Sequence, residues 1–215
     1  MQSTLPFCEV IDPLTHRDEF LTTSAYRYHM PDAVILCDRS FLYEKLFEEA
    51  GADVQFIKPE MLCSPFLPRF RALIIPTGFA NQQYSRALRN LRACKEGIEN
   101  FVRSGGVIVV FGPLVPEHDY DWLPIAIRYR GEYTEAAQIN FSCEGAPLCS
   151  DSGDCDGYLE PSEGIEVLAR DSSGRPVLCA GRYGEGMIFI TSIHEFPSAD
   201  FVRYVISMGK PSKII

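Results

Sequence analysis

The side chains best suited to catalysis stand where apolar runs of the chain end. His194 follows the run GMIFITSI (186–193), and Glu195 comes directly after it. An imidazole can act as a general base when an acid orients its ring. Adjacent residues on an extended chain point in opposite directions, so Glu195 is poorly placed to orient His194 directly. His194 and Glu195 are the first catalytic candidates.

A second group of polar side chains follows the run VIVVF (107–111). His118, Asp119 and Asp121 could bind a metal ion through one nitrogen and two oxygens, and His118 is the third catalytic candidate. A polar surface loop explains the same residues equally well. We therefore expect no resident cofactor and keep this metal site as an alternative.

The segment TGFAN (77–81) ends a further apolar run. Backbone N–H groups around Gly78 and Phe79 could form a cradle for an anion or an oxyanion. Alternatively, Gly78 only permits a turn and Asn81 caps the next helix. Because ligands of parallel α/β sheets bind beyond the carboxyl ends of the strands, we expect a ligand-binding edge there. Its residues are Thr77, Gly78, Phe79, Asn81, Gly112, His118 and Asp119.

The chain contains eight cysteines. Its N-terminus lacks a basic segment followed by an apolar run, so we expect no secretory signal, a cytoplasmic location and thiols rather than disulfides. Cys143, Cys149 and Cys155 have five residues between neighbours, whereas structural zinc sites show pairs two to four residues apart. A zinc site and thiols without a shared task are the two interpretations of this loop.

The first half of the chain alternates between strand and helix patterns. Apolar spacing predicts one helix from Ser40, its N-cap, to Gly51, and one long helix over 82–104. Prolines between residues 58 and 71 disfavour a regular crossover helix in that segment. This alternation predicts a parallel sheet with helices on both faces. The expected strands are 33–37, 53–57, 71–78 and 107–111, and all but 53–57 are expected to be buried.

The second half is richer in strand patterns. A closing helix is predicted over 198–208, with Ser198 as its cap, and residues 1–31 are irregular. No repeat or linker divides the chain, so we expect a single α/β domain over 1–215. The expected strands here are 125–130, 136–141, 165–170, 176–183 and 186–193.

The overall charge excludes two classes of partner. A net charge of −9 argues against sequence-independent nucleic-acid binding and against docking to an anionic membrane. No stretch approaches the roughly 18 apolar residues of a membrane span. The segment Gly184-Glu185-Gly186 lies between two strands, so it is a hairpin turn and not a dinucleotide fingerprint.

Three segments together resemble the class I glutamine amidotransferase-like superfamily, which includes glutaminase domains, an intracellular-protease and chaperone branch, and ThuA-like proteins. ALIIPTGFAN (72–81) is similar to the segment that supplies the oxyanion hole, and IENFVRSGGVIVVFGP (98–113) to the helix and nucleophile strand. PVLCAGRYGEGMIFITSIHEF (176–196) resembles the hairpin that leads to the catalytic His. The resemblance covers most of 33–208. It implies a flavodoxin-like three-layer sandwich with a mostly parallel central sheet and additional antiparallel strands in the C-terminal half.

Active members of the superfamily use a Cys-His-Glu or Cys-His-Asp triad. His194 matches the His, but Phe196 stands where the glutaminases carry the acid, two residues further on. Alignment of the strand turn puts Val110 at the Cys position, with Phe111 next to it. Neither side chain can attack a carbonyl. Cys94, the nearest Cys in sequence, lies on the predicted long helix and would need a different geometry.

The resemblance therefore implies a divergent member without the thiol chemistry. We expect a catalytically silent domain, not an enzyme, that binds a small polar ligand or a partner protein at the carboxyl edge of its strands. One alternative is a hydrolase of different mechanism, with or without a metal, that uses His118, Asp119, Asp121 and His194. The other is a purely structural or interaction subunit. Members of the superfamily are often dimers, so a homodimer is a further expectation.

Overall fold

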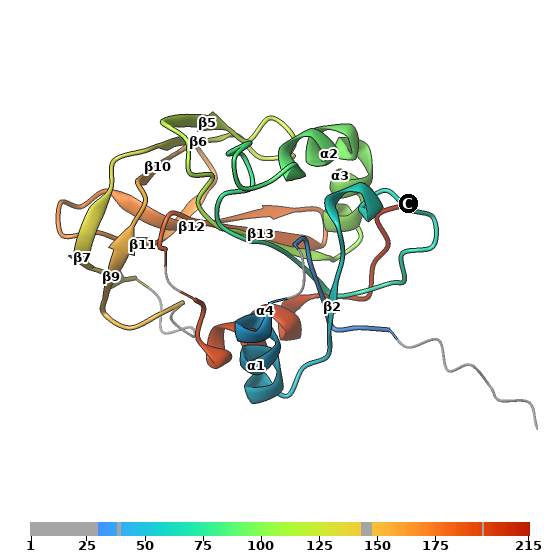
Figure 1. Ribbon diagram of the computed structural model, residues 1–215. Coiled ribbons are helices and arrows are strands. Elements are labelled where there is room, and N and C mark those ends of the chain that lie inside the picture. Colours follow the sequence, from blue (N-terminus) through green and yellow to red (C-terminus); the bar gives the residue numbers. More distant parts are fainter. Residues whose placement is uncertain (1–29, 38–39, 143–147, 195) are drawn as a thin grey trace, which may run out of the picture.

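The computed structural model describes residues 30–37, 40–142, 148–194 and 196–215, and an eight-stranded sheet forms its centre (Figure 1). The strand order is β2-β1-β3-β4-β13-β12-β11-β8. The pairs from β2 to β13 are parallel, and those from β13 to β8 are antiparallel. This confirms a mixed, largely parallel sheet with antiparallel C-terminal strands. In sheet order the strands are β2 (Val54–Phe56), β1 (Ala33–Ile35), β3 (Ala72–Ile75), β4 (Val107–Val110), β13 (Gly186–Thr191), β12 (Pro176–Tyr183), β11 (Glu166–Arg170) and β8 (Asn140–Phe141).

The central strands are apolar throughout because both faces of the sheet are covered. In β4, Ile108 and Val110 belong to the core on one face, while Val107 and Val109 belong to the core on the other. Successive side chains of a strand point to opposite faces, so a continuous apolar run fills both cores. The strands expected at 33–37, 71–78 and 107–111 are confirmed for this reason, and the strand expected at 53–57 forms β2, a half-buried strand at the edge of the sheet.

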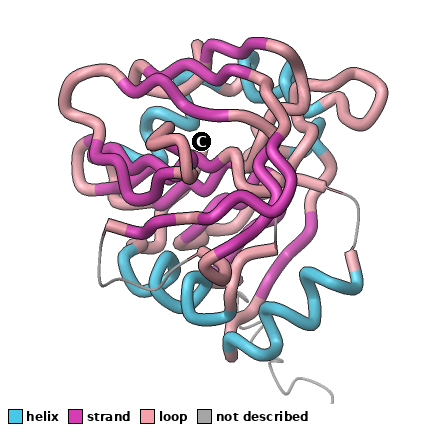
Figure 2. The backbone as a smooth tube through the Cα atoms, turned by 90° about the vertical axis from the view of Figure 1, so that its left-hand side faces the viewer, coloured by secondary structure: helices cyan, strands magenta, loops and turns pink. Residues whose placement is uncertain are grey.

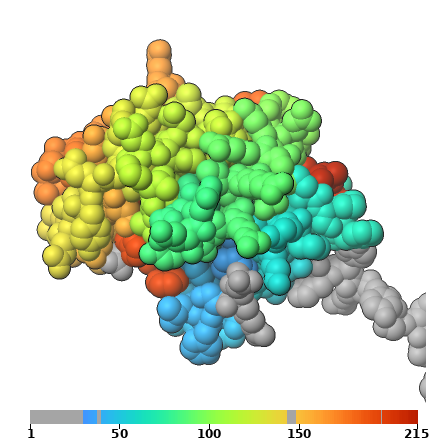
Figure 3. Space-filling model, turned by 45° about the horizontal axis from the view of Figure 1, so that its top comes forward, coloured from blue at the N-terminus to red at the C-terminus, as the bar shows by residue number. Residues whose placement is uncertain are grey.

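Different elements cover the two faces of the sheet (Figures 1 and 2). Helices α1 (Phe41–Ala50) and α4 (Ala199–Met208) pack on one face. The other face carries α2 (Ala87–Ala93), α3 (Lys95–Arg103) and a three-stranded sheet in the order β10-β6-β5. Figure 3 shows the surface of this second layer, in green and yellow-green. The remaining strands are β5 (Glu117–Asp119), β6 (Ile127–Arg130), β7 (Thr134–Gln138), β9 (Ser152–Cys155) and β10 (Tyr158–Pro161).

Two of the three predicted helix caps form. The Ser198 hydroxyl oxygen accepts a hydrogen bond from the N–H of Phe201 at 3.0 Å, and Gly51 ends α1 with a φ of 69°. Ser40 precedes α1, but its side chain makes no capping hydrogen bond, so that prediction was wrong in its chemistry.

The long helix expected over 82–104 is wrong, because the chain forms two shorter helices that meet at Cys94. Cys94 forms a disulfide with Cys63, and the two Cα atoms are 5.8 Å apart. This also corrects the expectation that the cysteines are thiols. Cys63 follows the short 3-10 helix η1 (Pro59–Met61), the one helical turn in the proline-containing connection between β2 and β3 among the described residues.

The second half departs from the expected strands in three ways. The segment 136–141 is divided between β7 and β8, which belong to different sheets. Strands β9 and β10 were not expected, because SDSGDC and DGYLEP show no apolar alternation. His118 and Asp119 lie on β5, not in a loop. Within the described ranges, no helix combines the length and apolar character that crossing a bilayer would need.

Candidate functional site

Two chain segments meet beyond the end of β13 and hold the candidate site together. The carbonyl oxygen of Ser192 accepts a hydrogen bond from the N–H of Asp156 at 2.8 Å. The N–H of His194 donates to the carbonyl oxygen of Asp154, also at 2.8 Å. The Tyr129 hydroxyl donates to the carbonyl oxygen of Asp156 at 2.7 Å. These bonds fix the backbone of Asp156 on both sides and so define where its side chain lies.

Asp156 and His194 form a hydrogen-bonded pair. The Nδ1 atom of His194 lies 2.7 Å from Oδ1 of Asp156. The side chain of Asp156 is 4% exposed, whereas that of His194 is 50% exposed. Burial raises the pKa of the Asp156 carboxyl, and the hydrogen bond from His194 opposes that rise. Because Nδ1 is engaged, Nε2 is the ring atom left to meet a ligand or a proton.

The end of β4 lies directly against this pair. A Cβ atom added to Gly112 would sit 2.8 Å from Oδ2 of Asp156, so only a glycine allows the two segments to approach this closely. Oδ2 is buried and has no hydrogen-bond partner among the described residues. Asp156 and His194 therefore stand beside the strand end at which the superfamily carries its nucleophile.

No accessible nucleophile accompanies the pair at this strand end, among the residues described. Val110 and Phe111 are apolar and fully buried. Ser192 is 0% exposed, so its hydroxyl is closed to a substrate. Cys155 precedes Asp156 and is also buried; burial raises the pKa of its thiol to about 12, which keeps it protonated at neutral pH. The pair thus has an orienting acid and an imidazole but no activated thiol or hydroxyl.

At the anion cradle predicted around Gly78, the backbone N–H of Gly78 is already used in a hydrogen bond within the protein. The N–H of Gly78 donates to the carbonyl oxygen of Gly112 at 2.7 Å. The amide nitrogen of Asn81 donates to the carbonyl oxygen of Leu114 at 3.1 Å. Phe79 is buried, at 2% exposed. These contacts tie the loop after β3 to the loop after β4, so Gly78 and Asn81 serve to hold the edge in shape.

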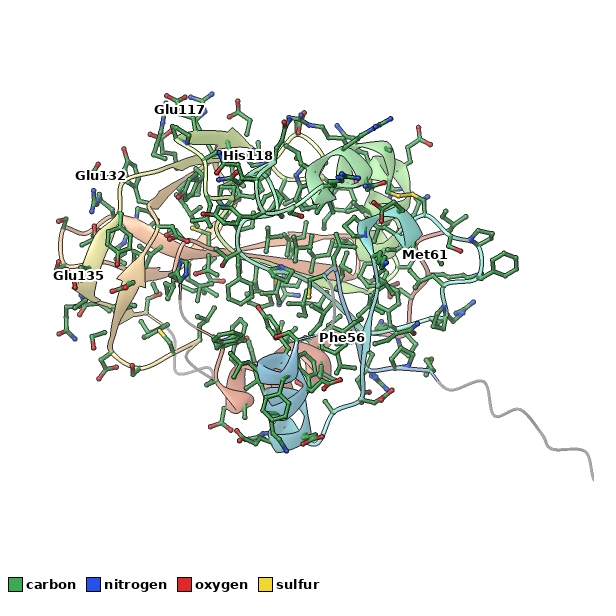
Figure 4. All side chains as sticks on the ribbon, in the orientation of Figure 1. Phe56, Met61, Glu117, His118, Glu132 and Glu135 are labelled. Carbon is green, nitrogen blue, oxygen red and sulfur yellow. A yellow bond between two sulfur atoms is a disulfide. The ribbon has the colours of Figure 1, made fainter. Side chains whose placement is uncertain are left out.

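His118 lies in the layer of β5, above the central sheet (Figure 4). Its ring packs edge-on against Phe79 and Tyr120, at centroid distances of 5.3 and 4.8 Å. Burial lowers the pKa of His118 to about 4, with a further contribution from the charge of Arg92. The imidazole is therefore neutral at neutral pH and belongs to an aromatic cluster.

The two acids near His118, Asp119 and Asp121, each pair with a different arginine. Asp119 accepts a hydrogen bond from Arg128 at 2.8 Å, which lowers the pKa of its carboxyl. Asp121 pairs with Arg92 at 3.1 Å. In the part of the chain that the structure describes, no three His, Cys, Asp or Glu side chains come together as a metal site would require. The geometry thus offers no support for a metal site at His118, Asp119 and Asp121.

The remaining candidate site residues lie in different parts of the chain. Cys149 is half-buried and Cys155 is buried, and these two do not join a metal-binding cluster within the described ranges. Cys143 and Glu195 lie outside the described residues. Phe196 is 49% exposed, and its ring meets that of Tyr43 at a centroid distance of 5.1 Å. Phe196, at the position where the sequence resemblance implies an acid, therefore makes an apolar contact.

A hollow of about 480 Å³ opens at the same edge, beyond β1 and β3. Thr77 and Phe79 line it, together with residues from the ends of β1 and β2. Gly112, Asn81, His118 and Asp119 do not line it. The carboxyl edge therefore has two parts: this hollow, and the Asp156–His194 pair beside Gly112.

Sequence reasoning found His194 but missed Asp156. The glutaminase pattern places the acid two residues beyond His194, whereas the acid that contacts its ring here lies 38 residues before it. Asp156 stands among several other acids and glycines in SDSGDCDGY, so nothing in the sequence distinguishes it from them as a site residue. Only the antiparallel bridge between Cys155 and Ile193 brings the two segments together.

Comparison with known proteins supports the fold. The sequence matches no protein-family model and no curated protein. Among solved structures, Cytoplasmic Protein STM1381 from Salmonella typhimurium LT2 is similar, with a TM-score of 0.56 and 16% identity over 85% of this chain and 100% of that chain. Cytoplasmic Protein STM3548 from Salmonella typhimurium gives a TM-score of 0.52 and 11% identity, over 83% and 99%.

A β-galactosidase from Bacillus circulans sp. alkalophilus is also similar, with a TM-score of 0.52 and 18% identity over 83% of this chain. This chain spans about 30% of the length of that enzyme. At such identities the likeness concerns the fold alone. It agrees with the α/β fold and largely parallel central sheet that the sequence resemblance implies.

Proposed function

We propose that this chain is an amidotransferase-like domain that lacks thiol chemistry and binds a small polar ligand at the carboxyl edge of its parallel strands. The observation that carries the proposal is the end of β4. Val110 and Phe111 are buried there, while Asp156 and His194 remain beside it as a hydrogen-bonded pair. A triad without its nucleophile cannot form a covalent acyl intermediate.

Binding is the role that the remaining groups suit. Asp156 holds the half-exposed ring of His194 in one orientation, which presents Nε2 as a fixed hydrogen-bonding atom. The hollow of about 480 Å³ lies at the same edge and falls within the usual size range of small-molecule sites. Loops that are bonded to each other, through Gly78 and Gly112, keep this edge preorganised.

The Asp156–His194 contact also favours a second candidate, a hydrolase in which His194 activates a water molecule. An imidazole oriented by a carboxylate is a competent general base. This version does not need His118, Asp119 or Asp121, whose side chains are engaged with aromatic rings and arginines. It does need a substrate carbonyl within reach of His194.

One assay separates these functions. Hydrolysis of glutamine, p-nitrophenyl acetate and a fluorogenic peptide is measured for the full chain and for His194→Ala, each with and without iodoacetamide. Binding without catalysis predicts rates equal to buffer in every sample. A rate that iodoacetamide abolishes would overturn the proposal. A rate that resists iodoacetamide but disappears in His194→Ala would establish the water-activating alternative instead.

A further inference from the structure

The hollow beyond β1 and β3 lies where the connections of the sheet change sides. From β1 the chain enters α1 on one face, and from β3 it continues to α2 and α3 on the other. Since the two connections diverge, they leave a crevice between the carboxyl ends of these adjacent strands. We infer that this crevice binds a small phosphomonoester. The inference rests on the proposed function and names the class of its ligand.

Two cations that line the hollow supply the charge for such a ligand. Lys58 follows β2 and Arg86 precedes α2, and both line the hollow. Neither pairs with a carboxylate of the described residues, although the whole chain carries a net charge of −9. Arg92, which lies outside the hollow, instead pairs with Asp121 at 3.1 Å. Two cations that line one concave surface and pair with no carboxylate of the described residues point to an anionic occupant.

The polar lining fits a phosphate better than a single carboxylate. A phosphomonoester carries a charge of about −1.5 to −2 near pH 7 and several strong acceptor oxygens. Two cations match that charge, and one acid, Glu60, also lines the hollow and opposes it in part. Hydroxyl and amide donors stand near the cations, from Thr77 and Ser85 and from Gln82. The guanidinium of Arg86 can hold two phosphate oxygens at once.

The segment that carries Arg86 is held in place before any ligand arrives. The N–H groups of Tyr84 and Ser85 both donate to the carbonyl oxygen of Asn81, at 3.0 and 2.9 Å. The side-chain oxygen of Asn81 accepts a hydrogen bond from the N–H of Gln83 at 3.0 Å. After Lys58 the chain turns through η1; Figure 4 labels Phe56, the last residue of β2, and Met61, the last residue of η1. A rigid loop reduces the entropy lost on binding.

Isothermal titration calorimetry tests the inference with ribose 5-phosphate, ribose and succinate as probes. Ribose 5-phosphate should bind saturably, with a Kd below about 1 mM, and ribose should not bind. Lys58→Gln and Arg86→Gln should each weaken binding about tenfold, because each removes a charge-assisted hydrogen bond. The matched control is Arg89→Gln, which removes an exposed cation from α2 that does not line the hollow and should leave the Kd within about twofold.

Three results would overturn the inference. They are no saturable binding of ribose 5-phosphate up to about 10 mM, equal binding in all three variants, and binding of succinate in preference to the phosphate. The altered side chains are exposed, so circular dichroism should show a folded protein in each case. Phosphate binding together with iodoacetamide-sensitive hydrolysis would overturn only the proposed function. Absence of both would overturn only the phosphate site.

Discussion

His194 and Asp156 are joined by a hydrogen bond of 2.7 Å across 38 residues of sequence. The second carboxylate oxygen of Asp156 is buried against Gly112, at the end of β4. The imidazole and acid of a triad-like arrangement are therefore present, while Val110 closes the strand end with an apolar side chain. From this arrangement we predict how substitutions change the free energy of unfolding and whether the chain reacts with an electrophile.

Replacing Asp156 with Asn should raise the free energy of unfolding at pH 7 by roughly 1 kcal/mol. Burial raises the folded-state pKa of this carboxyl, so its ionised form opposes folding. The destabilisation is absent below the unfolded-state pKa and complete above the folded-state pKa. The gain from Asp156→Asn should therefore shrink as the pH falls toward about 4. Urea unfolding of the wild type and Asp156→Asn at pH 7 and at about pH 4 measures this difference in the free energy of unfolding.

Asp154→Asn is the matched control for that experiment. Asp154 is a half-buried acid two residues away, and it accepts hydrogen bonds from the N–H of Ala136 and the hydroxyl of Tyr133. These bonds lower the pKa of Asp154, so its ionised form favours folding. The two variants should change stability in opposite directions at pH 7. A loss of stability in both would contradict the role of burial at Asp156.

Replacing Gly112 with Ala should destabilise the fold by about 1–2 kcal/mol, because the new Cβ would lie 2.8 Å from Oδ2 of Asp156. The double variant Gly112→Ala/Asp156→Ala removes the clashing carboxylate and should recover part of that loss. A double-mutant cycle on urea unfolding gives the coupling free energy. Strictly additive effects would show that the two residues do not meet.

His118 should make the fold sensitive to mild acid. Its folded-state pKa of about 4 lies below the ordinary value of 6.5, so the neutral ring stabilises the fold. That stability is complete above the unfolded-state pKa and is lost as the pH falls toward the folded-state value. The wild type should therefore lose on the order of 2 kcal/mol more than His118→Phe between pH 7 and about 4.5.

Tyr120→Phe is the control for His118, since it removes a neighbouring buried hydroxyl without removing a group that titrates in this range. Its unfolding free energy should fall with pH as steeply as that of the wild type. Parallel curves for the wild type and His118→Phe would show that the imidazole is not buried in its neutral form.

The Cys63–Cys94 bond should be detectable by thiol titration. A denatured sample prepared without reductant should contain two fewer reactive thiols than a reduced one. Reduction should lower the free energy of unfolding by about 3–4 kcal/mol, as the chain-entropy model gives for a sequence separation of 31. Cys63→Ala should lower it similarly and should no longer respond to reductant. Equal thiol counts in the two samples would show that both cysteines are free.

Local patterns predicted the parallel half of the fold because there each rule acts within one element. Continuous apolar runs give β3 and β4, and Ser198 caps α4 through its own side chain. The division of the 82–104 helix depends on a bond from Cys94 to a distant segment, which apolar spacing does not reveal. Strand β9 is similar: its acidic sequence pairs with β7 and leaves no periodic signal.

A site residue was predictable from the sequence only where the end of its own strand determines its position. His194 follows an apolar strand and matches the pattern of the superfamily that the sequence resembles, so its position at the strand end was predictable. Asp156 was not predictable, since its place depends on the pairing of Cys155 with Ile193. The surroundings of His118 were also hidden, because β5 and β6 form a separate sheet that buries the ring.

The most direct test of the central claim uses an electrophilic analogue of glutamine, 6-diazo-5-oxonorleucine, which traps the attacking thiol of glutaminases. The full chain is incubated with it, and intact mass and peptide mapping then locate any adduct. The absence of a nucleophile at Val110 and the closed, protonated thiol of Cys155 predict no adduct. A stoichiometric adduct on one cysteine, lost in His194→Ala, would contradict the account.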